Sequence, residues 1–263
     1  WLSETAVVSP ETQLCRSAVL ESAFDAAQIP VYDNVLYGGK ALSREENVLR
    51  VGQELGLCSA SSTVGERVTR GEAAVYLYET LTHPFAVKAP KSPVVCENRS
   101  DTNLNDYLME LRYLPDTVLN AFNEYGWKLV IDHAYTAKMG KLYNVSCTGV
   151  TSYQERTIYV SEAGAVLHEF GHFIEGELLS FPARSQELFN AEAKDAPFRS
   201  YAKTSSSEYF ADYFAYLLTH SDGSKSMQLL KKSTPKTYEY FHSLTINGEP
   251  LLGGSHAEEV KNY

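Results

Sequence analysis

The sequence predicts an α+β fold preceded by an all-α amino-terminal module, and three patterns support this prediction. Capped helical patterns occupy residues 1–88, and a linker follows at 89–103. Strands with alternating apolar residues then appear within 104–263, and further helices follow those strands. Helices and strands that are segregated along a chain, rather than alternating regularly, are typical of the α+β class.

Composition and charge limit the possible classes of protein. The chain has 263 residues, of which 44% are apolar and 12% aromatic, so it can bury a sizeable core. The formal net charge is −10, which argues against nucleic acid as a partner because phosphate binding needs clustered Lys and Arg. No stretch is long and apolar enough to span a bilayer.

The amino-terminal module contains two similar helix starts, "ALSREENVLRVGQEL" and "RVTRGEAAVYLYETL". Ser43 with Glu46, and Thr69 with Glu72, have the S/T-x-x-E spacing of a capping box, in which hydroxyl and carboxylate each bind a backbone N–H of the first turn. A loop is expected before each helix, "YDNVLYGGKA" in the first case, and "CRSAVLESAFDAAQI" predicts an earlier helix. The unit is therefore a helix, a loop and a capped helix, used about twice.

The second of these helix starts, "VTRGEAAVYLYETL", resembles the S-layer homology module over about residues 10–82. This resemblance implies a bacterial surface protein whose amino-terminal module binds a cell-wall polymer. The alternative is a plain helical domain with well-capped helices, because capping boxes are a general feature of helices.

The second domain is expected to start after the linker, where three prolines lie between His83 and Thr102. "DYLMELRYLPDTVLNAFNEYG" predicts a helix that breaks before Pro115, and "WKLVIDHAY" predicts a strand. "GVTSYQERTIYVSE" predicts one or two further strands, and helices are expected from there until near the carboxyl terminus.

Four cysteines are spaced widely along the chain: Cys15, Cys58, Cys96 and Cys147. An even, dispersed set fits two disulfides in an exported protein, although it also fits four unpaired thiols. Cys15–Cys58 with Cys96–Cys147 is the simplest pairing, because each bridge then stays within one predicted domain.

The segment "VLHEFGHFIEGE" contains an H-E-x-x-H motif on a predicted helix. His168 and His172 are one turn apart, so both imidazoles project from one face and can bind one zinc ion. Glu169 lies at the edge of that face, where it can act as the general base that activates a water. Catalytic zinc usually has three protein ligands, so a third ligand is needed elsewhere in the chain.

The best source of a third ligand is "RSYAKTSSSEYFADYFAYLLTHS", residues 199–221. On a helix capped by Ser205, Glu208 and Asp212 fall on one face of an otherwise apolar segment. Glu208 can bind the metal, and Asp212 can accept the free N–H of a ligating histidine. The alternatives are that Glu208 completes a capping box and that Asp212 is simply solvated.

"HEFGH", "SYAKTSSSEYFADYFAYLLTHS" and "KKSTPKTYEYFHSL" together resemble the catalytic domain of the anthrax lethal factor family, whose fold group includes the secreted Pro-Pro endopeptidases. The resemblance covers roughly residues 105–245 and implies a zincin-type metallopeptidase domain, in which a small mixed sheet accompanies the helices that carry HExxH. By position, it implies that His168, His172 and Glu208 bind one Zn²⁺. It further implies that Glu169 is the base and Tyr201 a hydrogen-bond donor in the transition state. Asp212 replaces the family's commoner Glu, and the large amino-terminal region of lethal factor is not found here.

The expected function is therefore that of a secreted or cell-surface zinc endopeptidase, acting on a protein or peptide outside the cell. Its substrate is expected to pair with the edge of a strand just before the zinc helix, at Gly149, Val150 and Thr151. Glycine at 149 would let the substrate chain approach closely. The alternative function is a noncatalytic surface-binding protein with a purely structural zinc, which would need neither Glu169 nor Tyr201.

Overall fold

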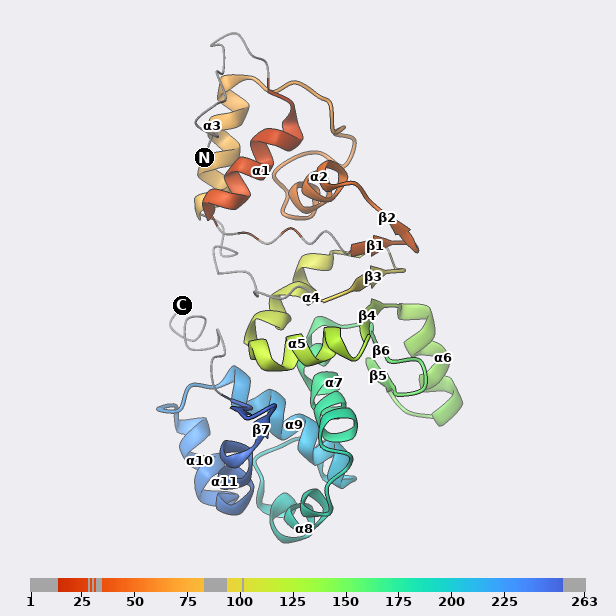
Figure 1. The fold of residues 1–263 in the computed structure, drawn as a ribbon, viewed down its shortest axis with the longest axis vertical. Helices are drawn as coiled ribbons and strands as arrows, with labels where there is room; N and C mark the ends of the chain where they lie inside the picture. Colours follow the sequence, from red (N-terminus) through yellow and green to blue (C-terminus); the bar gives the residue numbers. More distant parts are fainter. Residues whose placement is uncertain are drawn as a thin grey trace. The chain divides into compact units, whose positions relative to one another are not determined.

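The computed structural model describes residues 14–27, 29, 31, 35–82, 94–100 and 102–252, and these form two units (Figure 1). Unit 1 comprises Trp1–Asp33 and Leu42–Val87, and unit 2 comprises Asn34–Ala41 and Lys88–Tyr263. The predicted α+β class is confirmed, since the described residues combine helices with a mixed sheet. Part of the predicted linker, 89–93 and Asp101, lies outside the described residues.

Unit 1 contains three described helices: α1 (Arg16–Ala27), α2 (Arg44–Glu54) and α3 (Arg70–Thr82). Both predicted capping boxes are present. Ser43 Oγ accepts from Glu46 N while Glu46 returns a bond to Ser43 N, and Thr69 and Glu72 make the same pair of bonds. Helix α1 packs against the other two helices, and Leu20, Phe24 and Val48 are among the side chains of the shared core.

Unit 2 is built on a mixed sheet with strand order β2-β1-β3-β4-β6-β5. The four inner strands, β1, β3, β4 and β6, are parallel to one another. The two outer strands, β2 and β5, run antiparallel to their neighbours. The strands are β1 (Val35–Tyr37), β2 (Lys40–Ala41), β3 (Cys96–Asn98), β4 (Lys128–Ile131), β5 (Gly149–Ser152) and β6 (Thr157–Val160). The strands predicted in 149–162 are therefore confirmed as β5 and β6. The strand predicted at 127–135 is confirmed only to Ile131, because Asp132 caps a helix that begins at His133.

Two segments that the sequence analysis placed outside regular structure are strands of this sheet. The expected loop "YDNVLYGGKA" contains the β1–β2 hairpin, whose turn residues Gly38 and Gly39 have φ of 57° and 78°. Glycine tolerates this left-handed backbone, which suits a tight hairpin turn. The predicted linker contains β3, whose residues Cys96–Asn98 are buried between β1 and β4. Prolines nearby were thus poor evidence for a linker through residue 98.

The sequence did not predict a helix at 133–143, where the expected strand extends to Tyr135, but the helices of unit 2 otherwise follow the predicted order, including a break before Pro115. They are α4 (Leu104–Glu110), η1 (Leu111–Tyr113), α5 (Asp116–Glu124), α6 (His133–Tyr143), η2 (Ala163–Ala165), α7 (Val166–Phe173), η3 (Ile174–Leu178), α8 (Ala183–Glu192), η4 (Ala193–Asp195), η5 (Tyr201–Lys203), α9 (Ser206–Thr219), α10 (Lys225–Ser233) and α11 (Pro235–Ser243). A short hairpin of β7 (Thr245–Ile246) and β8 (Glu249–Pro250) follows them.

Helix α7 is held between the sheet and helix α9, because its apolar residues are buried on both sides. Phe170 and Phe173 join an aromatic cluster with Phe122 and Trp127, in which ring centroids are 4.7 to 6.1 Å apart. All four side chains are at most 1% exposed. This cluster fixes the orientation of α7 and, with it, the direction in which the motif's histidines point.

Helix α11 begins in the "TPKT" segment, and the carboxylate of Glu192 accepts hydrogen bonds from backbone N–H groups in the first turn of this helix. Glu192 Oε1 accepts from Lys236 N (3.0 Å), while Oε2 accepts from Thr237 N (2.8 Å) and Thr237 Oγ1 (2.7 Å). Pro235 occupies the first turn, where its missing N–H leaves no bond unmade. Glu192 therefore caps a helix that lies more than forty residues further along the chain.

The predicted disulfides are wrong for this structure, since all four cysteines are unpaired thiols. Cys96 lies in β3 and Cys147 directly before β5, so β4 and β6 separate the two. At about 4.8 Å per strand, that distance far exceeds the reach of a disulfide. The Cys15 and Cys58 thiols have other neighbours, Ser17 Oγ at 3.3 Å and Leu49 O at 4.0 Å respectively.

Among the described helices, none has the length and apolar character that crossing a membrane requires.

A candidate metal centre on helices α7 and α9

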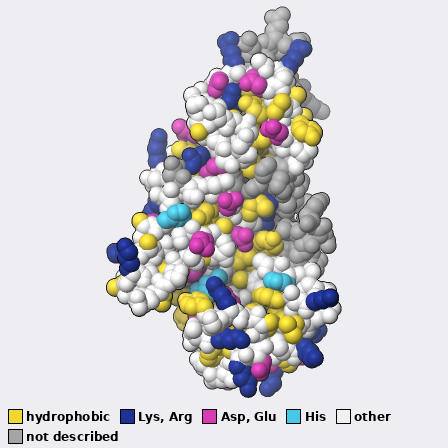
Figure 2. Space-filling model, turned by 180° about the vertical axis from the view of Figure 1, so that it is seen from behind, with side chains coloured by type: hydrophobic (Ala, Val, Ile, Leu, Met, Phe, Trp, Pro, Cys, Tyr) yellow, Lys and Arg dark blue, Asp and Glu magenta, His cyan; other side chains and the backbone are white. Residues whose placement is uncertain are grey.

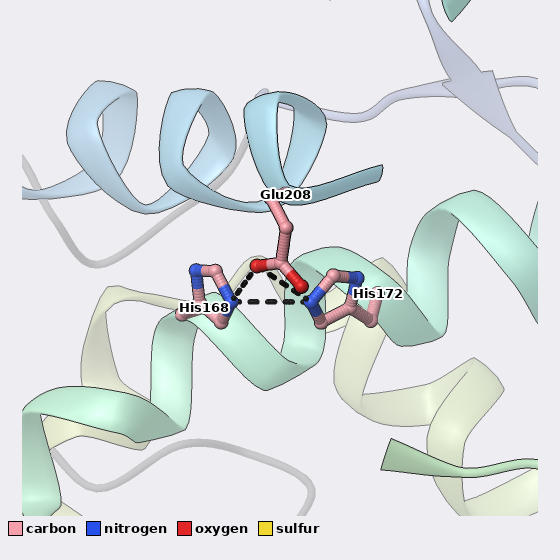
Figure 3. A group of neighbouring side chains, drawn as sticks. All are labelled: His168, His172 and Glu208. Atoms are coloured by element: carbon pink, nitrogen blue, oxygen red, sulfur yellow. Dashed lines mark hydrogen bonds and ion pairs between the residues drawn. The ribbon is translucent and has the colours of Figure 1, made fainter. Parts of the chain in front are cut away.

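Three side chains from two helices converge at the centre of unit 2 (Figure 3). His168 and His172 project from one face of α7, and their Nε2 atoms are 3.1 Å apart. Glu208, in the first turn of α9, places Oε2 at 3.0 Å from His168 Nε2 and at 3.6 Å from His172 Nε2. Figure 3 shows the carboxylate pointing between the two rings. The three predicted ligands are therefore adjacent.

The convergence depends on a close approach of α7 to α9. Gly171, between the two histidines, lies so close to α9 that a Cβ there would come within 2.6 Å of Ala211 Cα. A contact that short is sterically excluded, so only glycine permits this helix spacing. The cost of glycine inside a helix, about 1 kcal/mol, is offset by this packing.

The two imidazoles are held so that both Nε2 atoms face Glu208. Asp212 Oδ1 lies 2.6 Å from His168 Nδ1, and because a carboxylate only accepts, Nδ1 carries the proton. His172 Nδ1 lies 3.1 Å from Ser207 Oγ. Outer hydrogen bonds of this kind orient metal-binding histidines in many proteins.

These residues fit a bound zinc ion. Glu208 Oε2 is a buried atom that makes no hydrogen bond, although two imidazole nitrogens lie close to it. Two imidazoles and one carboxylate, with their ligand atoms within 4.8 Å of one another, form a donor set that zinc prefers. Burial lowers the pKa of His168, but the neighbouring carboxylates of Asp212 and Glu208 outweigh this effect and raise the pKa to about 9. A cation that binds Nε2 must therefore displace a proton.

Asp212 lies behind His168 and is itself held by Arg199. Arg199 Nε and Nη2 donate to Asp212 Oδ2 and Oδ1 at 2.8 and 2.7 Å, which is the two-bonded geometry of a strong ion pair. Burial acts to raise the pKa of Asp212, but the hydrogen bonds from His168 and Arg199 hold it below its ordinary value. The contact expected between Asp212 and a motif histidine is present, and solvation alone does not describe this carboxylate.

Glu169 is almost completely buried beside the cluster, at 5% exposure. Its Oε2 accepts a hydrogen bond from Thr151 Oγ1 at 2.7 Å. Burial raises the pKa of Glu169, while the nearby histidines oppose that shift. A carboxyl group whose pKa is raised in this way is better able to take and return a proton near neutral pH.

Tyr201 lies in η5, where its hydroxyl donates to Glu208 Oε1 at 3.0 Å. The side chain is 42% exposed, and its ring centroid is 6.4 Å from that of His168. Burial and the charge of Glu208 raise the pKa of the Tyr201 phenol, so it remains a proton donor. The phenol thus lies at the open side of the cluster, and its role as a hydrogen-bond donor in the transition state remains a prediction.

Ser205 caps α9, but Glu208 does not complete a capping box. Ser205 Oγ accepts from Glu208 N at 3.2 Å, whereas the Glu208 carboxylate turns towards Tyr201 and the histidines. Of the two hydrogen bonds that define a capping box, only the one from Glu208 N to Ser205 Oγ is therefore present.

Two open hollows flank the cluster, and His168, Glu169 and Tyr201 line both of them. One hollow has a mixed polar and apolar lining that includes Glu162 and Arg199. The other is largely apolar and is lined in addition by Met139, Tyr143, Val145, Val150, Tyr153 and Phe181. On the face shown in Figure 2, many of the described Lys and Arg side chains gather in the lower part of the picture, with few acidic side chains among them.

Strand β5, which contains the predicted substrate-pairing residues, lies at the edge of the sheet. It pairs only with β6 among the described residues. Gly149 leaves room on one face of the strand, but Glu169 occupies that room, since a Cβ at 149 would lie 2.3 Å from Glu169 Oε1. Glycine at this position is thus explained by Glu169, and the predicted approach of a substrate remains a prediction.

Sequence reasoning missed two residues of the site, Arg199 and Ser207, and one contact, that of Thr151 with Glu169. Ser207 and Arg199 lie within the quoted ligand segment, but their partners, His172 of α7 and Asp212 of α9, become their neighbours only in the folded chain. Thr151 was singled out only as a strand-edge residue. Strand alternation does place its side chain on the same face as position 149, which is a signal that could have indicated it.

The fold and the site define an α+β domain with an H-E-x-x-H helix packed against a helix that carries an acidic residue. The family model described as "Anthrax toxin lethal factor, N- and C-terminal domain" matches residues 101–244. This match spans more than half of the chain, and the chain belongs to the anthrax lethal factor family. No curated protein matches it.

Proposed function

We propose that this protein is a secreted or cell-surface zinc-dependent endopeptidase. The observation that carries the proposal is the convergence of His168, His172 and Glu208, with Glu169 and Tyr201 on the same open side. The family match supports the same class, because lethal factor-like domains are zinc-dependent in general. A structural zinc site would need neither a buried carboxylate beside it nor an exposed phenol above it.

The proposed chemistry assigns a separate task to each side chain. Zinc bound by His168, His172 and Glu208 would polarise a peptide carbonyl and make a water more acidic. Glu169 accepts a proton from the attacking water as the C–O bond forms, and then delivers it to the nitrogen of the leaving amine as the C–N bond breaks. Tyr201 donates to the carbonyl oxygen as negative charge develops there, after exchanging its present bond to Glu208 for this one.

The substrate is proposed to be a protein or peptide bound as an extra strand along β5. The outer edge of β5 offers backbone N–H and C=O groups, because β6 takes only the inner edge. An extended peptide can pair with such an edge and place its side chains in the flanking hollows. Val150 lines the apolar hollow, so its side chain can take part in such contacts.

The amino-terminal module is proposed to bind a cell-wall polymer, in line with its S-layer homology resemblance. Both capped helices on which that resemblance rests are present in unit 1. Co-sedimentation of the full chain with purified bacterial cell wall tests the idea. A chain that stays in the supernatant favours the alternative of a plain helical domain.

The experiment that tests the peptidase proposal combines metal analysis with cleavage. Elemental analysis is expected to find one zinc per chain, and a peptide library is expected to be cleaved by the zinc-loaded protein and not after chelation. Zinc without any cleavage would favour the alternative, a surface-binding protein with a structural metal. Absence of zinc would contradict both functions.

A further inference from the structure

Strand β5 contacts the side chain of Glu169 directly, through the hydroxyl of Thr151. Thr151 Oγ1 lies 2.7 Å from Glu169 Oε2 and 3.1 Å from the Glu169 carbonyl oxygen. A carbonyl oxygen and an ionised carboxylate only accept, so in the ionised state of Glu169 the Thr151 hydroxyl donates, and its proton points to the nearer, charged oxygen. The hydroxyl thus holds the carboxylate of Glu169 against strand β5 and also lies close to the backbone carbonyl of Glu169.

A second residue of β5 restricts Glu169 from the side of its other oxygen. A Cβ at Gly149 would lie 2.3 Å from Glu169 Oε1 and 2.6 Å from Glu169 Cγ, so the bare strand backbone is packed against the side chain. Gly149 and Thr151 are two residues apart and face the same side of the sheet. These two contacts therefore require glycine at position 149 and a side chain with a hydroxyl at position 151.

These contacts matter because glutamate is otherwise a flexible side chain. Glu169 has three rotatable side-chain bonds, and a base must be held close to its productive geometry to transfer a proton efficiently. At 5% exposure, its carboxylate also has little water with which to replace a lost donor.

We infer that Thr151 is a positioning residue for the reaction: its hydroxyl fixes Oε2 of Glu169 and leaves Oε1 to exchange protons with water and the leaving amine. This role rests on the proposed peptidase function. It is separate from the predicted pairing of β5 with the substrate backbone, which would involve main-chain groups only.

The test compares two substitutions at 151 with a matched substitution in the neighbouring strand. Thr151→Val removes the hydroxyl and keeps the shape, whereas Thr151→Ser keeps the hydroxyl. Thr157→Val is the control, because Thr157 is a buried threonine of β6 whose hydroxyl donates only to Glu155 O. Each full-length, zinc-loaded protein is assayed for kcat and KM on one cleavable peptide, for zinc affinity by chelator competition and for melting temperature.

Thr151→Val is expected to lower kcat by ~10–100-fold, the effect typical of removing an orienting partner, with little change in KM or zinc affinity. Thr151→Ser is expected to restore most of the lost rate, and Thr157→Val to keep the wild-type kcat. An active wild type whose Thr151→Val variant keeps its kcat overturns the inference alone. Loss of zinc or of folded protein in Thr151→Val, unrepaired by Thr151→Ser, also overturns it, since Thr151 would then be structural. A wild type that binds zinc and cleaves no peptide overturns the peptidase function and this inference together.

Discussion

Gly171 of α7 and Ala211 of α9 are in direct backbone contact: an added Cβ at 171 would come within 2.6 Å of Ala211 Cα and 3.1 Å of Ala211 Cβ. The two histidines on α7 and the glutamate on α9 can meet only because the helices approach this closely. The contact therefore connects the packing of the core with the geometry of the metal centre.

Gly171→Ala is expected to force the two helices apart and to weaken both folding and metal binding. Overpacking of this kind costs about 1–3 kcal/mol of unfolding free energy, and the cost outweighs the gain in helix propensity. Chemical denaturation and zinc titration measure the two effects. Gly223→Ala is the control, since nothing lies within 4 Å of a Cβ there. Equal stability of the two variants would show that α7 and α9 can separate without cost.

Glu208→Ala is expected to weaken zinc binding by more than the ~10–100-fold typical of an outer partner, because it removes a ligand itself. Chelator competition on the purified variant measures the affinity. Glu177→Ala, in η3 after the motif, is the matched control because Glu177 is not part of the cluster. Similar zinc loss from the two variants would move the third ligand away from α9.

Glu169→Gln is expected to retain zinc and to lose peptidase activity, since the amide keeps the shape and an acceptor but cannot take a proton at neutral pH. The expected loss in kcat is about 10²–10⁴-fold. Zinc content is measured in the same preparation, so that inactivity is not confused with metal loss. Near wild-type turnover in this variant would mean that another group accepts the proton.

Tyr201→Phe separates a catalytic hydroxyl from a packing ring. If the phenol stabilises the developing charge, kcat should fall by about 10²–10³-fold with little change in KM. Zinc affinity and melting temperature should stay near wild type, because the ring remains and only its bond to Glu208 is lost. Steady-state kinetics on one peptide decide the matter: an unchanged kcat removes Tyr201 from the catalytic groups.

Glu192→Gln tests the remote cap of α11. The variant replaces one acceptor oxygen by an NH₂ group, which faces backbone donors in a site only 7% exposed. A loss of about 1–3 kcal/mol in unfolding free energy is expected, the cost of an unsatisfied buried donor. Glu187→Gln on the same helix is the control, because its side chain is 63% exposed. Equal denaturation midpoints would show that Glu192 contributes nothing to α11.

Much of the site was predictable because its signals are local in sequence. The spacing of His168 and His172 defines a helix face, and the Ser205 cap fixes where α9 begins. Given those two helices, the position of Glu208 in the first turn of α9 follows. The partners of these residues were harder to predict, because Arg199 reaches Asp212 and Thr151 reaches Glu169 through tertiary contacts that no short pattern encodes.

The less predictable part of the fold consists of short strands paired over long sequence distances. β1 and β3 have three residues each, too few for an alternating pattern to emerge, and neighbouring Gly or Pro residues favoured a loop or linker. The Gly38–Gly39 pair between short apolar runs did carry a hairpin signal. The disulfide prediction failed for a different reason: an even number of cysteines does not show that strands β4 and β6 lie between Cys96 and Cys147.

The β1–β2 hairpin has a consequence for how the chain is made. Helix α1 of unit 1 precedes the hairpin and helices α2 and α3 follow it, yet β1 belongs to unit 2 and pairs Val35 with Cys96. On the ribosome, β1 can therefore pair with β2 at once, but its other neighbour, β3, emerges only after helices α2 and α3 have been synthesised. Contacts that span so much sequence form slowly, so the hairpin is expected to join the sheet late. Protein synthesis that stops before residue 96 leaves the helices of unit 1 together with a hairpin that has no sheet to join.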